Sequence, residues 1–429
     1  MPHSKRSYAF QVVGPSNVDA LAEPISAFRR AARQELRQQR QWHGAADERL
    51  GPRYWRWCCV ENPAGRSASV VALRDGCVVG MLANVYVRFR LAGRRVMASV
   101  VGDLSILEPE RSWRCYVGLV EESLARAVAD RVTLGYCFVI RASVELVQRM
   151  GGARVARPPV FAGVLDVPKA LQGGGVPRWL SLAGGLVQPL VRLRRGGAPA
   201  FPRGTRGLEI RRLEGPYGRP FDELWGAVAE SRGIAAVRDA AYLNWRYVKC
   251  PDREYTRLAA FRSGRPEGLV VFRSSPKLRA GYLLELYARD DCPAVLRALL
   301  ESALELLGED GIGMVGASFP AGSGEAGALI DLGFQRWASR LWGTEFIVIT
   351  DRSAGACPEL DPSNWYFSLG DWFTHWPAPG CSRPFSLEKR PPVGPQSHCW
   401  ACLERRNRPG GLRHRFGWVG TGRGFGRLG

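Results

Sequence analysis

The sequence lacks a long uninterrupted apolar run. Its most apolar stretch, residues 179–191, contains two Gly and one Pro and is far shorter than the roughly 20 residues that a membrane-spanning helix requires. No apolar run follows Lys5 and Arg6 near the N-terminus, so the pattern of a signal peptide is missing. We therefore expect no transmembrane segment and a cytoplasmic protein.

Regularly spaced cysteines are also missing. The 11 Cys show none of the spacings of a disulfide framework, which favours a reducing compartment. Four of them lie in strand-like runs, where we expect small buried thiols: Cys58, Cys59, Cys77 and Cys137. The pair Cys399 and Cys402 has only irregularly spaced His and Cys residues nearby, whereas a structural zinc site needs four ligands. We expect no metal.

Acidic residues are few relative to basic ones. The chain has 60 Lys and Arg against 40 Asp and Glu, a net charge of +20, and a basic surface is typical of proteins that bind nucleic acid. However, residues 377–429 hold ten Lys and Arg against two Glu and show no helix or strand period, and the remaining excess is spread along the chain. This distribution argues against a nucleic-acid partner and predicts a basic disordered tail.

What the sequence does contain is a long internal repeat. Eight residues recur without a gap 188 positions further on: Tyr54, Trp57, Val60, Pro63, Ala72, Arg74, Gly76 and Gly80 reappear as Tyr242, Trp245, Val248, Pro251, Ala260, Arg262, Gly264 and Gly268. After extra residues around 89–95 in the first copy, the offset becomes 182, which aligns Asp103 with Glu285 and Met150 with Leu332. An ungapped match of this length indicates a duplicated domain.

Both copies have the same predicted order of elements: helix, hairpin, strand, helix, strand, helix and strand. In the first copy these are residues 18–40, 69–87, 96–107, 112–131, 132–140, 143–150 and 160–167, and in the second 221–231, 256–272, 282–288, 292–307, 313–318, 324–332 and 344–350. We therefore predict an α/β (layered α+β) fold class with two tandem domains, residues 1–170 and 208–376. Each is expected to be a mixed, mostly antiparallel sheet flanked by helices.

A segment rich in Gly, Pro and Arg, residues 171–207, separates the two predicted domains. Such a composition is typical of a linker. Trp179, Leu182, Leu186 and Leu190 recur at helical spacing. One amphipathic turn here could therefore anchor the linker on a domain or on a membrane surface.

Several of these passages resemble a known family. The strand 96–107, the break at Glu108-Pro109-Glu110-Arg111, the helix after it and the short helix ending at Met150-Gly151 resemble the GNAT superfamily of acyl-CoA-dependent N-acyltransferases. The Tyr-x-x-Trp-Arg-Tyr from Tyr242 to Tyr247 resembles a phrase common in bacterial proteins with two GNAT-like domains, a layout shared in outline with Fem-type aminoacyl transferases. The resemblance implies a tandem GNAT N-acyltransferase that uses acetyl-CoA or a related acyl-CoA as co-substrate. It also implies a small amine or amino-sugar acceptor, as in polysaccharide biosynthesis.

The passage from Leu104 to Arg111 is similar to the strand and phosphate loop of that family. A strand that stops where backbone amides converge at a helix start offers donors and a positive dipole end to a pyrophosphate. The predicted acyl-CoA-binding residues are Leu104, Ile106, Arg111, Ser112, Trp113, Arg114, Cys115 and Tyr116. The family pattern is Arg or Gln, two residues, Gly, one residue, then Gly or Ala, but this loop has no Gly and would depend on its arginines. The second copy has Asp290 and Asp291 at this place, which would repel a pyrophosphate and predict a degenerate half.

The chemistry of amine attack on a thioester requires a base for the ammonium proton and a donor for the leaving thiolate. GNAT enzymes often carry a carboxylate base on the central strand, which makes Asp103 the predicted base. A hydrogen-bonded structural acid is the alternative. Tyr136 is the predicted thiolate donor, with a core Tyr as the alternative. Trp57 and Trp245 are expected in the core, although aromatic side chains could also line an acceptor groove.

Two other functions remain open on the sequence. The loop without Gly is compatible with a non-catalytic binding or scaffold protein built from two degenerate copies. The basic composition is compatible with a Fem-type transferase that uses aminoacyl-tRNA.

Overall fold

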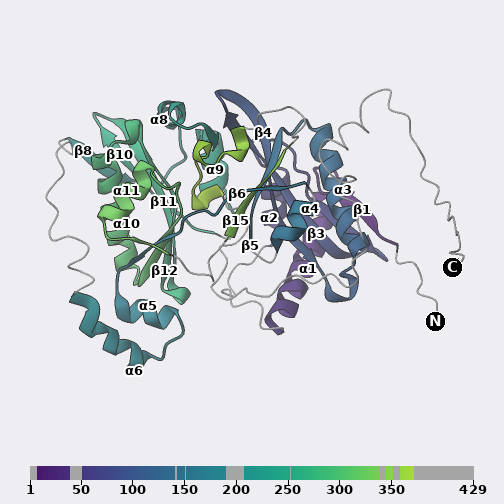
Figure 1. Ribbon diagram of the computed structural model, residues 1–429, viewed down its shortest axis with the longest axis horizontal. Helices are drawn as coiled ribbons and strands as arrows, with labels where there is room; N and C mark the ends of the chain where they lie inside the picture. The colour runs from purple at the N-terminus through teal and green to yellow at the C-terminus, as the bar shows by residue number, and fades with distance from the viewer. Residues whose placement is uncertain are drawn as a thin grey trace, which may run out of the picture.

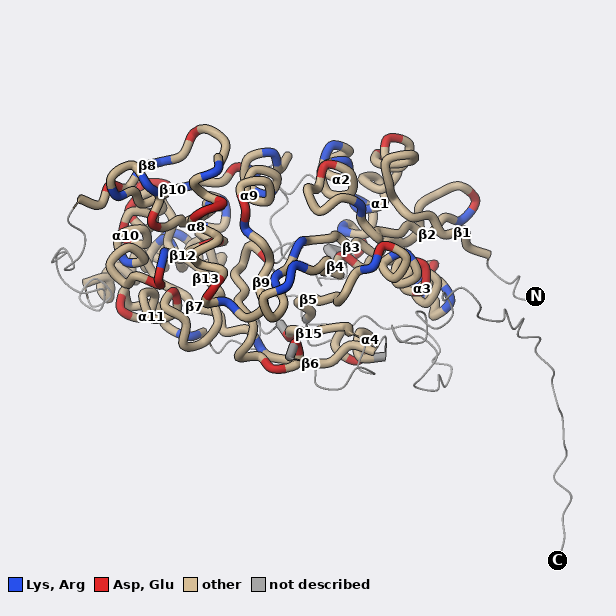
Figure 2. Tube along the Cα trace, turned by 90° about the horizontal axis from the view of Figure 1, so that it is seen from above, with Lys and Arg blue, Asp and Glu red and all other residues tan. Residues whose placement is uncertain are grey.

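The computed structural model describes residues 7–38, 51–140, 143–149, 151–189, 207–251, 253–337, 344–350 and 358–371. In these ranges the protein consists of two sheets with their helices, side by side along the long axis of the molecule (Figure 1). Acidic and basic residues are interspersed over both halves when they are viewed from above (Figure 2). The predicted tail and the pair Cys399 and Cys402 lie outside the described residues.

The elements follow each other in nearly the same order in both halves. The first half has β1 (Ala9–Val12), α1 (Val18–Gln38), α2 (Pro52–Cys59), β2 (Val70–Arg74), β3 (Cys77–Leu91), β4 (Arg94–Ile106), η1 (Glu108–Glu110), α3 (Trp113–Ala129), β5 (Leu134–Ile140), α4 (Val144–Arg149), β6 (Ala153–Ala156) and β7 (Phe161–Val164). The linker contains α5 (Val167–Gly173), α6 (Arg178–Ser181) and η3 (Leu182–Val187). The second half has β8 (Leu208–Arg212), α8 (Arg219–Glu230), β9 (Ile234–Ala236), α9 (Ala240–Tyr247), β10 (Thr256–Arg262), β11 (Arg265–Ser275), β12 (Ala280–Ala288), η5 (Arg289–Asp291), α10 (Pro293–Glu309), β13 (Met314–Ala317), α11 (Gly324–Asp331), β14 (Gln335–Arg336) and β15 (Thr344–Thr350).

The two sheets have equivalent topologies. The first has the strand order β1-β2-β3-β4-β5-β15-β6, and the second has β8-β10-β11-β12-β13-β7-β14. In each sheet the neighbours are antiparallel except for one central parallel pair, β4 with β5 and β12 with β13. This confirms the predicted fold class of two mixed, mostly antiparallel sheets flanked by helices.

Two strands are exchanged between the halves. β7, from the first half of the sequence, lies in the second sheet and pairs with β13 and β14. β15, from the second half, lies in the first sheet between β5 and β6. Neither sheet is therefore built from one half alone. The predicted ranges 1–170 and 208–376 divide the sequence, but neither range contains a complete sheet.

Both predicted hairpins form with two-residue turns. Asp75 and Gly76 have φ angles of 51° and 78°, and Ser263 and Gly264 have 49° and 78°. Left-handed φ at both positions is the geometry of a type I′ turn, which matches the twist of the flanking strands. The repeat therefore extends to the backbone conformation of the turn.

The extra residues that shift the repeat lie at the end of the β3–β4 hairpin. This end reaches the second half, where Phe89, Arg90 and Leu91 pair with β9. The insertion in the first copy thus adds a strand contact between the halves.

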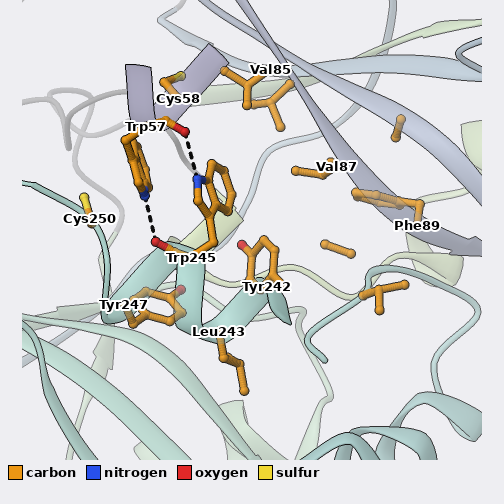
Figure 3. Close-up of a cluster of buried hydrophobic side chains, with 14 of the residues drawn as sticks. Trp57, Cys58, Val85, Val87, Phe89, Tyr242, Leu243, Trp245, Tyr247 and Cys250 are labelled. Carbon is orange, nitrogen blue, oxygen red and sulfur yellow. Dashed lines mark hydrogen bonds between the residues drawn. The ribbon is translucent and has the colours of Figure 1, made fainter. Parts of the chain in front are cut away.

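The two copies also meet at the repeated tryptophans. The rings of Trp57 and Trp245 stack with centroids 4.7 Å apart and planes 18° apart. Each indole N–H donates to the backbone carbonyl of the other residue, at 2.8 and 3.0 Å (Figure 3). Because the same contact is made in both directions, the pair lies on a pseudo-two-fold axis between the copies. Both side chains are buried in a cluster that contains residues of both halves, which confirms them as core residues.

The sequence pattern was incomplete in places. It gave no assignment to α9, β6, β8, β9 or β14, because each is short. The expectation that Cys58 and Cys59 lie in a strand-like run was wrong, since both residues end helix α2. The expectation of a buried Cys77 was wrong, since this residue begins β3 beside the turn and is exposed, whereas Cys58, Cys59 and Cys137 are buried. No helix in the described ranges is long and apolar enough to cross a membrane.

Candidate functional site

An open strand edge lies in the middle of the first sheet. β4 and β5 are parallel, and in the described residues they pair only at 98–100 with 134–136. β4 continues to Ile106 and β5 to Ile140, so the two strands separate beyond Val100 and Tyr136. The ladder of β4 with β3 shifts register at this point, and Asp103 has a φ of 48°. A bulge of this kind bends a strand and ends its pairing.

Asp103 faces helix α1 from this bulge. Its Oδ1 lies 3.1 Å from Nη2 of Arg29, and the two side chains are 13% and 8% exposed. Arg29 also donates from Nη1 to Ser105 Oγ at 3.4 Å. Whether Asp103 acts as a base or as a structural acid, its ion-pair partner is Arg29. The sequence reasoning missed Arg29, although its spacing of four and eight residues from Ile25 and Leu21 places a charge on the apolar face of α1.

Tyr136 forms the last β4–β5 pair. Its ring is buried against Phe89, Phe346 and Trp365, and its hydroxyl has no hydrogen-bond partner among the described residues. Burial raises the pKa of this phenol well above its usual value, and the charge of Asp371 raises it further. A phenol with a raised pKa keeps its proton, so Tyr136 is a neutral hydrogen-bond donor and not a base.

The predicted phosphate loop ends at a capped helix. Ser112 is the N-cap of α3, where its Oγ accepts from the N–H of Cys115 at 3.3 Å and its carbonyl accepts from Tyr116 at 3.1 Å. The side chains of Cys115 and Tyr116 are buried, and burial raises the pKa of the Cys115 thiol to about 12. A helix leaves the N–H groups of its N-cap and first turn without intrahelical acceptors. The N–H groups of Ser112, Trp113 and Arg114, which precede the two that bond to Ser112, have no acceptor within the helix.

Acidic side chains occupy part of this loop. Arg111 donates from Nε to the carbonyl of Ile106 at 3.1 Å and pairs with Glu35 at 3.3 Å. Glu35 also accepts from the backbone N–H of Glu108 at 3.1 Å, and Glu110 is paired with Arg74. No sequence pattern indicated Glu35, because it reaches the loop from α1, which is distant in the sequence. The side chain of Arg114 is exposed at the start of α3.

The equivalent carboxylate of the second half, Glu285, is fully buried. It accepts from Arg238 and Tyr247 at 2.7 Å each and from Ser368 at 3.0 Å. Arg238 also pairs with Asp371 at 2.6 Å. Burial raises the pKa of Glu285, and the positive charge of Arg238 opposes this rise.

Residues 368–371 cover Glu285 from one side. A Cβ on Gly370 would lie 2.3 Å from Glu285 Oε1 and 2.2 Å from the Tyr247 hydroxyl. No substrate amine has room to approach the carboxylate from this side. Glu285 is therefore part of a buried ion-pair network, and Asp371, which belongs to the same network, was missed by the sequence reasoning.

The loop of the second half that corresponds to the phosphate loop contains Asp290 and Asp291, both with positive φ. Asp291 pairs with Arg232, and the same Arg232 lies 2.7 Å from Glu325. Glu325 is fully buried. The positive charge of Arg232 at this loop is thus neutralised by Asp291 and Glu325.

The comparisons with known proteins identify the fold. No protein-family model matches the chain, and no curated protein matches it in sequence. N-myristoyltransferase from Saccharomyces cerevisiae with bound myristoyl-CoA is similar over 84% of this chain and 83% of its own, with 13% identity and a TM-score of 0.54. A GCN5-related N-acetyltransferase from Anabaena variabilis is similar over 80% and 72%, with 11% identity and a TM-score of 0.51. A tandem GNAT protein from the clavulanic acid biosynthesis pathway is similar over 80% of this chain and 98% of its own, with 15% identity and a TM-score of 0.47. The first two likenesses show that this chain has the fold of the GNAT N-acyltransferases.

Proposed function

We propose that the protein is an acyl-CoA-dependent N-acyltransferase whose donor site lies in the first half. The observation that carries this proposal is the open edge of β4, which begins beyond Val100 and Tyr136 in a chain with the GNAT fold. The pantetheine arm of acyl-CoA contains amide groups. Such a chain can hydrogen-bond to an unpaired strand edge as an added strand does.

The direction of the main chain supports Leu104 and Ile106 as residues of this edge. The N–H of Leu107 donates to the carbonyl of Val79 on β3 at 3.0 Å. Successive residues of a strand direct their main-chain groups to opposite sides, so those of Ile106 and Leu104 point away from β3. Arg111 already covers the carbonyl of Ile106, which makes Arg111 a positioning residue in this proposal.

The pyrophosphate of the donor would bind at the start of α3. The N–H groups of Ser112, Trp113 and Arg114 and the positive end of the helix would bind the phosphate oxygens. The exposed guanidinium of Arg114 adds a charge-assisted contact. We do not include Cys115 and Tyr116 among the proposed acyl-CoA contacts, because their side chains are buried and their N–H groups donate to Ser112.

In the reaction, Asp103 would accept the proton of the acceptor ammonium. The free amine attacks the thioester carbonyl, and the tetrahedral intermediate collapses with cleavage of the C–S bond. Tyr136 would then give its proton to the leaving CoA thiolate, and the extra proton of the attacking nitrogen would restore the phenol. Arg29 positions Asp103, which lies three residues beyond the last β4–β5 pair. The acceptor class, a small amine or amino sugar, rests on the family resemblance.

A second candidate function is a non-catalytic protein with the GNAT fold. The observation in its favour is Glu35, which accepts from Glu108 and pairs with Arg111 within the phosphate loop. A carboxylate there competes with a phosphate for the same groups. This candidate predicts that the protein does not bind acyl-CoA.

Calorimetric titration with acetyl-CoA separates the two candidates. For the wild type we expect a micromolar Kd, about −8 kcal/mol. Arg114→Ala removes one charge-assisted contact and should weaken binding about tenfold, or about 1.4 kcal/mol. The matched control is Arg219→Ala, because Arg219 is 89% exposed at the first turn of α8 and should leave the affinity unchanged. Absence of binding to the wild type would favour the non-catalytic candidate, and equal affinities of all three proteins would place the pyrophosphate elsewhere.

A further inference from the structure

The linker helices, residues 167–189, form a compact substructure beside the second sheet. α5, α6 and η3 contact each other and lie below β12 in Figure 1. They are held at their base, where a Cβ on Gly313 would lie 2.2 Å from the backbone of Ala170.

The amide and hydroxyl side chains of the linker helices form hydrogen bonds within the substructure. Gln172 donates to the Oγ of Ser181 at 3.0 Å, and Ser181 is fully buried. Gln188 accepts from the N–H of Val167 at 2.7 Å and donates to the carbonyl of Leu165 at 3.0 Å. These hydrogen bonds close the substructure and fix its orientation.

The large apolar side chains of the same helices point outward. Their exposed fractions are 72% for Trp179, 46% for Leu180, 62% for Leu182, 85% for Leu186 and 46% for Val187. In water a chain folds with the opposite polarity, because burial of apolar surface drives folding. We call these five side chains the apolar patch; large exposed apolar side chains gathered in one short segment mark a surface that contacts something else.

The charge of this part of the chain limits what that partner can be. Between residues 167 and 207 there is no Asp or Glu, and the basic residues are Lys169, Arg178, Arg192, Arg194, Arg195, Arg203 and Arg206. A second copy of this surface, or the basic tail 377–429, would bring like charges together. Lys169 is already paired with Asp166 at 3.5 Å, and the six arginines give the segment a net positive charge that an anionic surface attracts.

We propose that the linker helices dock on the surface of an anionic lipid membrane. Trp179 and the leucines would enter the headgroup region, where Trp is favoured because its ring is apolar and its N–H is polar. Arg178, which is exposed on α6, would face the anionic headgroups. A surface of this kind lies on a bilayer without crossing it.

The test is co-sedimentation of the full chain with lipid vesicles. We expect binding to vesicles of about three parts phosphatidylcholine to one part phosphatidylglycerol, and much weaker binding to phosphatidylcholine alone. Leu182→Ser/Leu186→Ser should lower the partition coefficient at least about tenfold. The matched control is Val248→Ser/Ile330→Ser, which changes two exposed apolar residues elsewhere, 38% and 57% exposed, and should bind like the wild type.

Because all four side chains are exposed, each variant should keep the melting temperature of the wild type, and circular dichroism checks this. The proposal is overturned if the wild type does not bind anionic vesicles, or if both double variants bind equally. Sedimentation equilibrium of the same proteins measures their oligomeric state. A wild-type dimer that Leu182→Ser/Leu186→Ser abolishes, without lipid binding, would show that a second copy covers the patch.

Discussion

Trp57→Phe is a direct test of how the two copies are joined. The substitution removes the hydrogen bond from the indole N–H of Trp57 to the carbonyl of Trp245, 2.8 Å long. Both residues are buried, so water cannot replace the lost donor without opening the core. An unsatisfied buried polar group costs about 1–3 kcal/mol of folding free energy, in addition to the packing lost with the smaller ring.

Trp55 provides the matched control for this substitution. It lies on the same helix and is also buried, but its indole N–H has no hydrogen-bond partner in the described part of the chain. Trp55→Phe therefore loses packing without losing a hydrogen bond. The difference between the two variants should be about 1–3 kcal/mol, with Trp57→Phe the less stable.

Urea unfolding followed by tryptophan fluorescence and by circular dichroism measures this difference. Coincident curves from the two probes would show that the halves unfold together. Equal losses for the two variants would refute the reasoning, because the bond between the copies would then contribute nothing to stability.

Three further predictions concern the carboxylates. Glu285→Ala leaves Arg238 buried with one counter-charge fewer and should lower the free energy of unfolding by about 3–5 kcal/mol in urea titrations; a loss under 1 kcal/mol would contradict a structural role. Asp103→Asn keeps the size of the side chain and should lower turnover at least about tenfold, as measured by CoA thiol release with a panel of amines, with little change in stability. Unchanged turnover would exclude Asp103 as the base. Burial raises the pKa of Glu325, against the charge of Arg232, so the folded state keeps this proton to a higher pH than the unfolded state. The contribution of Glu325 to stability is therefore full below its ordinary pKa of 4.5 and is lost as the pH rises through the folded value. Glu325→Gln should flatten the fall of melting temperature above pH 4.5, and an unchanged slope would contradict this assignment.

Much of the fold could be predicted because its signals are local. The Asp-Gly turn and the aligned strands of the two copies depend on neighbouring residues, and they formed where the pattern placed them. The exchange of β7 and β15 could not be predicted in this way. Each strand has the same alternation whichever sheet it joins, and its partners lie far away in the sequence.

The candidate site was predictable only in part for the same reason. The repeat located Asp103 by its alignment with Glu285, which is a property of the sequence. The surroundings of the two carboxylates depend on elements distant in the sequence. Asp103 pairs with a residue of α1, and Glu285 is covered by residues 368–371. Identical positions in the repeat therefore have different environments, and the sequence does not encode this difference locally.

The central claim is that the acyl donor binds the open edge of β4 in the first half and not the equivalent strand in the second. Hydrogen–deuterium exchange of the full chain, with and without saturating acetyl-CoA, tests this most directly. We predict slower exchange in peptides covering residues 101–115, where the N–H groups of Leu104, Ile106 and the start of α3 would bind the donor. Peptides covering residues 283–297 should be unchanged. Protection in the second half, or in neither half while the ligand is bound, would contradict the account.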